Sequence, residues 1–220
     1  MALACTAAMA FAGCGSASEE ERERSDSERA RAALLRQADL PVEWTRIDDD
    51  GETPQPSAEA RAKMCPGYPA EWLFSAGDDY VTFESDLGVV IHGVTTVADG
   101  TDAAAQFEDL GSPRSLRCVS GTLTWSMQQA NGESEIELKL GKVRTELLKR
   151  GGDERGVHIE TTLGTPDGSV EIPVEADFLA THEGDHFSTV AVLGLQEPVN
   201  PALRDRLAEI AAQRLQQVFG

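Results

Sequence analysis

Positive charge is scarce in this sequence of 220 residues. Lys and Arg number 19 against 38 Asp and Glu, which gives a formal net charge of −19 at pH 7. A surface potential of that sign repels phosphate groups and favours solubility. Nucleic acid and membranes rich in anionic headgroups are therefore not expected as partners.

The opening stretch "MALACTAAMAFAGC" has no charged residue, but it is too short to cross a membrane. A transmembrane helix needs roughly 20 apolar residues. The stretch fits the apolar part of a secretion signal, and Phe11-Ala12-Gly13-Cys14 resembles the lipobox of bacterial lipoproteins. We expect residues 1–13 to be a signal peptide and Cys14 to be acylated. A buried N-terminal helix is the alternative. The missing Lys or Arg before the apolar run is consistent with a start codon further upstream.

Residues 14–27, from Cys14 through "GSASEEERERSDS", contain almost only Gly, Ser and charged side chains after the cysteine. Such a segment buries too little apolar surface to offset the entropy lost on ordering. We expect a disordered acidic tether there, which places the folded domain, residues 28–220, outside the cytoplasm and anchored to the membrane by lipid.

Cysteine is rare, and two of the four cysteines lie in the expected signal and anchor, at Cys5 and Cys14. Cys65 and Cys118 remain, and in an exported chain an even pair predicts a disulfide. Zinc ligation by this pair is not expected because neither cysteine belongs to a C-x-x-C motif. A catalytic role for this pair is not expected either, because it would require a free thiol and a basic partner.

The first half of the chain mixes helical and strand patterns. Ala, Leu and Arg predict a helix from Glu28, and Ser57 is an expected cap for a short helix before Cys65. Strands are predicted over 42–48 and 71–97. Two further helices are predicted: one is capped by Thr101, and the other is opened by Ser112-Pro113 and carries Cys118.

The second half alternates apolar and polar residues with period two over 134–148, 156–163 and 169–180. One apolar face per strand indicates an antiparallel sheet that is covered on one side. A final helix is predicted after Asn200 and Pro201, with an apolar stripe that faces the core. The predicted fold is a single α+β domain with an antiparallel sheet of about 5–7 strands, packed by helices on one face.

The segment His182-Glu183-Gly184-Asp185-His186 matches the H-E-x-x-H pattern of zinc peptidases. In such enzymes a helix places both histidines on one face. Here the flanking residues alternate like strands, and Glu183-Gly184-Asp185 suits a hairpin turn. We therefore predict a turn. The alternatives are an incidental metal site, if the hairpin brings His182 and His186 together, and a zinc-dependent hydrolase that uses His182, Glu183 and His186.

Other catalytic motifs are missing from the sequence. It has no G-x-S-x-G elbow, no phosphate-binding glycine loop and no dinucleotide fingerprint. No cofactor and no metal are expected. A serine triad without a local motif is left open, because its members assemble only in space.

Three segments, "LLRQADLPVEW", "AAAQFEDL" and "SPRSLRCVSGTL", resemble a pattern in small exported or lipid-anchored actinobacterial proteins. These proteins are similar to the extracellular sensor domain of PknH-type membrane kinases. An actinobacterial source also agrees with fifteen Arg against four Lys. The resemblance covers about Leu34 to Phe219. It implies a twisted antiparallel sheet with helices on one face and a groove for a ligand. The kinase sensor has two disulfides, whereas this chain offers one cysteine pair.

These features predict a membrane-anchored ligand-binding or sensor-like domain without catalysis. Its partners would be the membrane, through the lipid, and an unidentified small-molecule, lipid or cell-envelope ligand. A groove between sheet and helices is a common kind of binding site. Besides the hydrolase, a lipid-carrier lipoprotein is an alternative. The candidate groove residues are aromatic, although such side chains also suit a core: Trp44, Trp72, Phe74 and Trp125.

Overall fold

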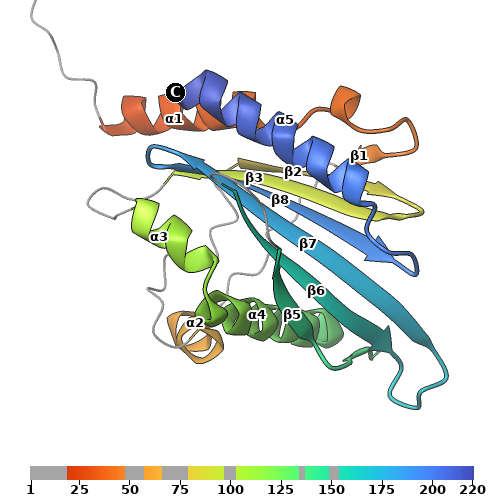
Figure 1. Ribbon diagram of the computed structural model, residues 1–220. Coiled ribbons are helices and arrows are strands. Elements are labelled where there is room, and N and C mark those ends of the chain that lie inside the picture. Colours follow the sequence, from red (N-terminus) through yellow and green to blue (C-terminus); the bar gives the residue numbers. More distant parts are fainter. Residues whose placement is uncertain (1–18, 48–56, 66–78, 97–102, 134–136, 149–153) are drawn as a thin grey trace, which may run out of the picture.

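The computed structural model describes residues 19–47, 57–65, 79–96, 103–133, 137–148 and 154–220 (Figure 1). The helices in these ranges are α1 (Glu19–Ala33), η1 (Gln37–Asp39, a 3-10 helix), α2 (Ala58–Met64), α3 (Ala103–Leu110), α4 (Pro113–Glu133) and α5 (Pro201–Phe219). The strands are β1 (Thr45–Ile47), β2 (Asp79–Ser85), β3 (Gly88–Thr96), β4 (Lys139–Leu140), β5 (Arg144–Leu148), β6 (Glu154–Gly164), β7 (Glu171–Glu183) and β8 (His186–Leu195).

The strands form one antiparallel sheet, in the order β1-β2-β3-β8-β7-β6-β4, with β5 also paired to β6. The predicted α+β class with a single antiparallel sheet is confirmed. The sheet has eight strands, because the segment predicted as one strand over 134–148 divides into β4 and β5 around Gly141. The amide of Gly141 donates to the carbonyl of Thr162 on β6 at 2.8 Å.

One core cluster lies between a face of the sheet, α5 and the segment that follows α1, and a second cluster joins α1 to α5 and β3 (Figure 1). α5 begins as predicted, because the Asn200 side chain accepts hydrogen bonds from the amides of Ala202 and Leu203, and Pro201 occupies the first turn. Its predicted stripe is buried at Leu207, Ala211 and Leu215. The stripe packs on Phe83, Val90, Val190 and Val192 of the sheet and on the N-terminal residues Leu35, Leu40 and Trp44.

The opposite face of the sheet is covered in part by α3 and α4. Leu116, Val119 and Leu123 of α4 pack on a buried cluster of Val157, Ile159 and Ala176. The predicted packing of helices on one face is confirmed by α1 and α5, and α3 and α4 add partial cover on the other face. Asp177, a polar position of β7, is only 2% exposed because it lies under α5, where it contacts Arg204.

α1 starts earlier than the predicted helix. It begins at Glu19, so the prediction of a disordered tether is wrong for residues 19–27, while residues 1–18 lie outside the described part. Glu, Arg and Ala are strong helix formers even without an apolar stripe. The helix is also held by the domain, because the Ser27 hydroxyl donates to Asp79 at 2.7 Å and Arg31 pairs with the same carboxylate.

His92 on β3 joins the segment that follows α1 to the sheet. The buried ring accepts a hydrogen bond at Nδ1 from the Leu35 amide at 2.9 Å, so Nε2 carries the proton and donates to the Ser188 hydroxyl at 2.8 Å. Burial first, and then the positive charge of Arg214, lower the pKa of His92 to about 3. The ring is therefore neutral in the folded protein at pH 7.

We expect acid to destabilise the fold through His92. Because its folded pKa is below the unfolded value of about 6.5, its contribution is intact above that pH and is lost as the pH falls towards 3. Between pH 7 and pH 5 the loss is about 2 kcal/mol. Urea unfolding of the wild type and His92→Gln at both pH values measures it. An equal loss in the variant would show that His92 is not the cause.

Candidate functional site

The His182–His186 segment forms the tip of the β7–β8 hairpin, as predicted. Glu183 pairs with His186 across the ladder, and the chain reverses at Gly184 and Asp185. Gly184 has a φ of 56°, a left-handed conformation that glycine adopts without a steric penalty.

The hairpin register places the two histidines on opposite faces of the sheet. His182 pairs with Phe187 and His186 pairs with Glu183, and adjacent positions of a strand point to opposite sides. The ring centroids of His182 and Phe107 on α3 are 4.5 Å apart, whereas His186 stacks on Phe219 of α5 with ring centroids 3.6 Å apart.

This geometry corrects the idea that the hairpin brings His182 and His186 together. The two rings contact helices on different sides of the sheet, so they cannot share one metal ion. In the parts of the chain that the structure describes, no group of three or more His, Cys, Asp or Glu side chains could hold a metal.

The four aromatic candidates for a ligand groove have different positions. Trp44 is 3% exposed and belongs to the core under α5. Trp72 and Phe74 lie outside the described residues. Trp125, on α4, lines an open groove between α2 and α4.

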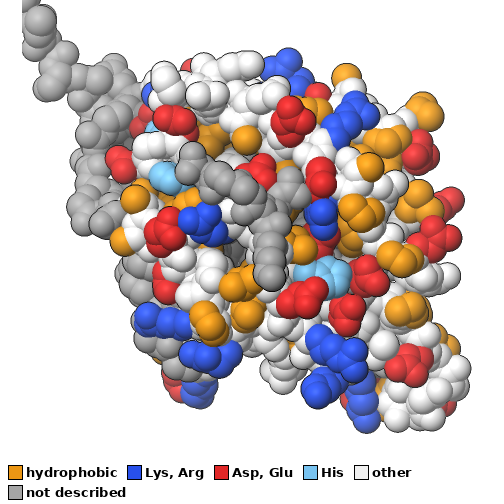
Figure 2. Space-filling model, viewed as in Figure 1, with side chains coloured by type: hydrophobic (Ala, Val, Ile, Leu, Met, Phe, Trp, Pro, Cys, Tyr) orange, Lys and Arg blue, Asp and Glu red, His pale blue; other side chains and the backbone are white. Residues whose placement is uncertain are grey.

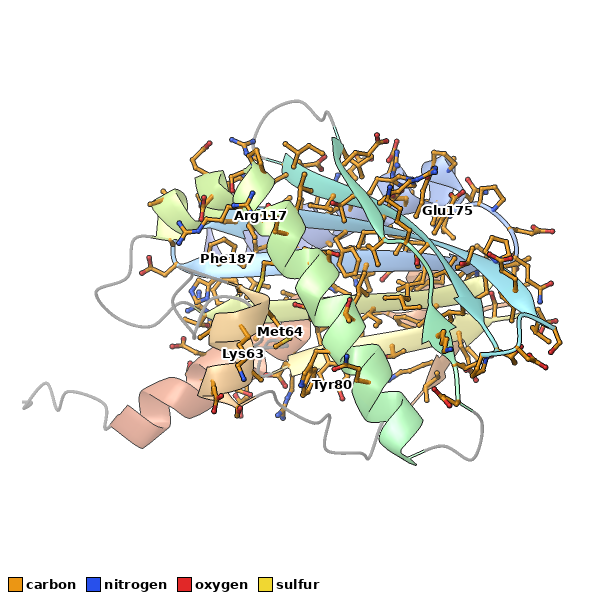
Figure 3. All side chains as sticks on the ribbon, turned by 90° about the horizontal axis from the view of Figure 1, so that it is seen from below. Lys63, Met64, Tyr80, Arg117, Glu175 and Phe187 are labelled. Carbon is orange, nitrogen blue, oxygen red and sulfur yellow. A yellow bond between two sulfur atoms is a disulfide. The ribbon has the colours of Figure 1, made fainter. Side chains whose placement is uncertain are left out.

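This α2–α4 groove has a volume of about 670 Å³. Figure 3 shows Lys63 and Met64 on α2 and Arg117 nearer the start of α4. α2 and the residue before it contribute Ser57, Glu59, Ala60, Lys63 and Met64. α4 contributes Arg117, Ser120, Gly121, Thr124, Trp125 and Gln128.

The groove is built by a close contact and a disulfide. Cys65, directly after α2, is bonded to Cys118 of α4, which is the pair predicted from the sequence. One turn further along α4, a Cβ added at Gly121 would lie 2.8 Å from the carbonyl oxygen of Met64. Glycine therefore lets the backbone of α2 approach α4. Because α4 is fixed to the sheet by its other face, α2 is held as the outer wall.

Several groove side chains already have local partners. Lys63 and Glu59 form an i,i+4 ion pair at 2.9 Å, with side chains 76% and 79% exposed. The Ser57 hydroxyl caps α2 by accepting from the Ala60 amide at 3.2 Å, as predicted. Thr124 donates to the Ser120 carbonyl at 3.0 Å. The side chains of Lys63 and Glu59 remain available to a ligand, because an exposed pair of this kind contributes little stability.

A second cluster of titratable groups lies on the face that α5 covers. His158 of β6 and Asp177 of β7 are cross-strand partners, and their Nδ1 and Oδ1 atoms are 2.6 Å apart. Arg204 of α5 donates to the other oxygen of Asp177 at 2.7 Å. Arg204 also donates through Nε to Asp205 at 2.7 Å. No local sequence pattern predicts this cluster, because His158, Asp177 and Arg204 are far apart in the chain.

No protein-family model matches the sequence, and no curated protein matches it. The solved structure of a point mutant of protein Mog1 is similar over 81% of this chain and 82% of its own, with 8% identity and a TM-score of 0.33. The Saccharomyces cerevisiae Ran-binding protein Mog1p is similar over 70% of this chain and 83% of its own, with 10% identity and a TM-score of 0.28. Such distant likenesses say nothing about the function of this chain.

Within the described ranges, no helix combines the length and the apolar character needed to cross a bilayer.

The charge of His158 depends on its acidic neighbours. Burial lowers its pKa, but the hydrogen bond and charge of Asp177, with the charges of Glu175 and Glu160, raise the pKa above its ordinary value. Glu146 lies directly across the ladder on β5. Because the folded pKa is raised, the stabilisation is complete below about pH 6.5 and is lost as the pH rises through the folded value.

We therefore expect His158→Gln to destabilise the protein more at pH 5.5 than at pH 8.5. A hydrogen bond to a charged group contributes about 1.5–3 kcal/mol, and the effect at low pH should lie near the lower end because the side chain is 17% exposed. Urea midpoints at the two pH values measure the difference. A cost that does not change with pH would contradict the assignment of the charge to His158.

Proposed function

We propose that this protein is an exported binding or sensor-like domain that is anchored by acyl chains on Cys14 and holds a ligand in the α2–α4 groove, without chemistry of its own. The observation that carries the proposal is the disulfide between Cys65 and Cys118. Disulfides form and persist in oxidising compartments outside the cytoplasm. The same bond fixes the outer wall of the groove, which ties the expected location to the expected site.

The lining of the open groove supports binding. Small-molecule sites combine apolar or aromatic side chains with a few polar groups, and the α2–α4 groove places Trp125 and Met64 beside Gln128 and Ser120. In contrast, the histidines on which a hydrolase would depend point to opposite faces of the sheet.

Location and anchoring are tested with the full chain produced in an actinobacterial host. Cells are fed an alkyne-labelled palmitate, fractionated, and treated with a polyethylene-glycol maleimide before and after reduction. We expect label in the membrane fraction, its loss in Cys14→Ser, and a gel shift for Cys65 and Cys118 only after reduction. Cys5→Ser is the matched control, because that residue lies inside the expected signal peptide and its replacement should leave labelling unchanged.

The opposite pattern would overturn the proposal. An unlabelled chain in the cytosol, with Cys65 and Cys118 open to the maleimide before reduction, would remove both the anchor and the oxidising location. Label that persists in Cys14→Ser would place the acyl group elsewhere and contradict the anchor assignment.

A further inference from the structure

The α2–α4 groove has the opposite charge balance to the rest of the molecule. The chain has 38 acidic and 19 basic residues, whereas the groove is lined by two bases, Lys63 and Arg117, and one acid, Glu59. The space-filling view shows one group of Lys and Arg side chains at the lower left, where α2 lies, another below the strand ends at the lower right, and acidic side chains across much of the remaining face (Figure 2).

The local charges of the groove outweigh the distant acidic surface for a ligand that sits between the helices. At physiological ionic strength, exposed charges are screened beyond about 8 Å. The net charge of −19 therefore opposes large anionic surfaces such as nucleic acid, but it acts only weakly on a small anion inside the groove.

Both cations are accessible to such an anion. Lys63 pairs with Glu59 of its own helix, and both side chains are largely exposed, so a ligand can replace or share that weak pair. The exposed Arg117 forms no ion pair within the described parts of the chain. A guanidinium forms two parallel hydrogen bonds with a carboxylate or phosphate, which makes arginine suited to such groups.

Part of the lining suits an apolar ligand body. Met64, Ala60 and the half-buried Trp125 line the groove beside the polar side chains of Ser57, Ser120, Thr124 and Gln128. Trp and Arg side chains are also enriched among the residues that dominate binding energy. An apolar body would exclude water from these surfaces, which strengthens the charged contacts beside them.

We infer that the groove binds an organic oxyanion, a carboxylate or phosphate carried on an apolar body, with the oxyanion at Lys63 and Arg117 and the body against Trp125. This inference rests on the proposed function, because it names the ligand class of the same site. The sequence alone pointed away from anionic partners, since net charge does not reveal where the few cations lie.

The test uses the full chain with Cys14→Ser, so that no acyl group competes, and isothermal titration with small probes below their micelle concentrations. Octyl phosphate and octanoate have the expected chemistry, octyl glucoside has the same tail without charge, and inorganic phosphate has the charge without the tail. We expect one site for either anionic amphiphile. Arg117→Ala and Lys63→Ala should each raise its Kd about tenfold, whereas Arg206→Ala, an exposed control on α5, should not.

Trp125→Ala should weaken binding of the anionic amphiphiles, and a thermal scan of the same variant separates lost binding from lost folding. Failure of both anionic amphiphiles to bind, or equal binding of octyl glucoside, would overturn the inference. Equal binding of inorganic phosphate would also overturn it. The same holds if Arg206→Ala lowers the affinity for the anionic amphiphiles as much as Arg117→Ala does. None of these results depends on palmitate labelling or thiol protection, so the inference can fail while the exported anchor stands, and the reverse also holds.

Discussion

Replacing both Cys65 and Cys118 by serine lowers the free energy of unfolding by about 4 kcal/mol, the expected loop-closure contribution of a disulfide across 53 residues. The bond limits the freedom of the unfolded chain between α2 and α4, and its loss leaves that freedom to oppose folding. Urea unfolding of the wild type and of the double variant measures the difference.

Reduction is the matched control for this prediction. The wild type in a reducing buffer should unfold at the midpoint of the double variant, while the variant itself should not respond to the reductant. Amide exchange adds a local readout: α2 should lose protection first, because an isolated helix of its length is unstable in water, and β7 and β8 should keep theirs. An unchanged midpoint on reduction would show that the pair contributes no stability.

Asp177→Asn is expected to destabilise the protein by about 3 kcal/mol, since breaking a buried ion pair by removing one partner typically costs about 3–5 kcal/mol. The carboxylate is only 3% exposed, and it contacts Arg204, which is 15% exposed, as well as His158. Without its charge, two cations from different elements face each other with no anion between them at low pH. Urea unfolding at pH 6 measures the change.

Asp205→Asn provides a control on the same arginine. Its carboxylate is also 2.7 Å from Arg204, but its side chain is 47% exposed. An exposed ion pair contributes about 0–1 kcal/mol, so this variant should unfold almost like the wild type. Equal effects of the two substitutions would show that burial of Asp177 is not what makes its charge important.

The elements that the sequence predicted best are those with local signals. The stripe of α5 and its cap at Asn200 follow from helical spacing and capping chemistry, and the turn at Gly184 follows from glycine between two alternating segments. The pairing of Cys65 with Cys118 follows from simple elimination among few cysteines. Each of these signals lies within a few residues or concerns a rare residue type.

The features that escaped prediction depend on contacts between distant segments. Asp177 occupies a polar position in an alternating strand, and only α5, later in the chain, shows that this position is buried. The N-terminal charged segment has a composition that suits a helix and a tether equally well, and the contact of Ser27 with Asp79 decides for the helix. The groove depends on the close approach of Met64 to Gly121, which no periodicity reveals.

The two margins of the sheet limit how this protein can assemble with itself. One margin is β1, which is three residues long, and the other is divided between the two residues of β4 and the five of β5. A continuous row of unpaired amides and carbonyls invites another chain to add as a strand. Among the described residues neither margin offers a long row of this kind, so the addition of further chains through their backbones is disfavoured.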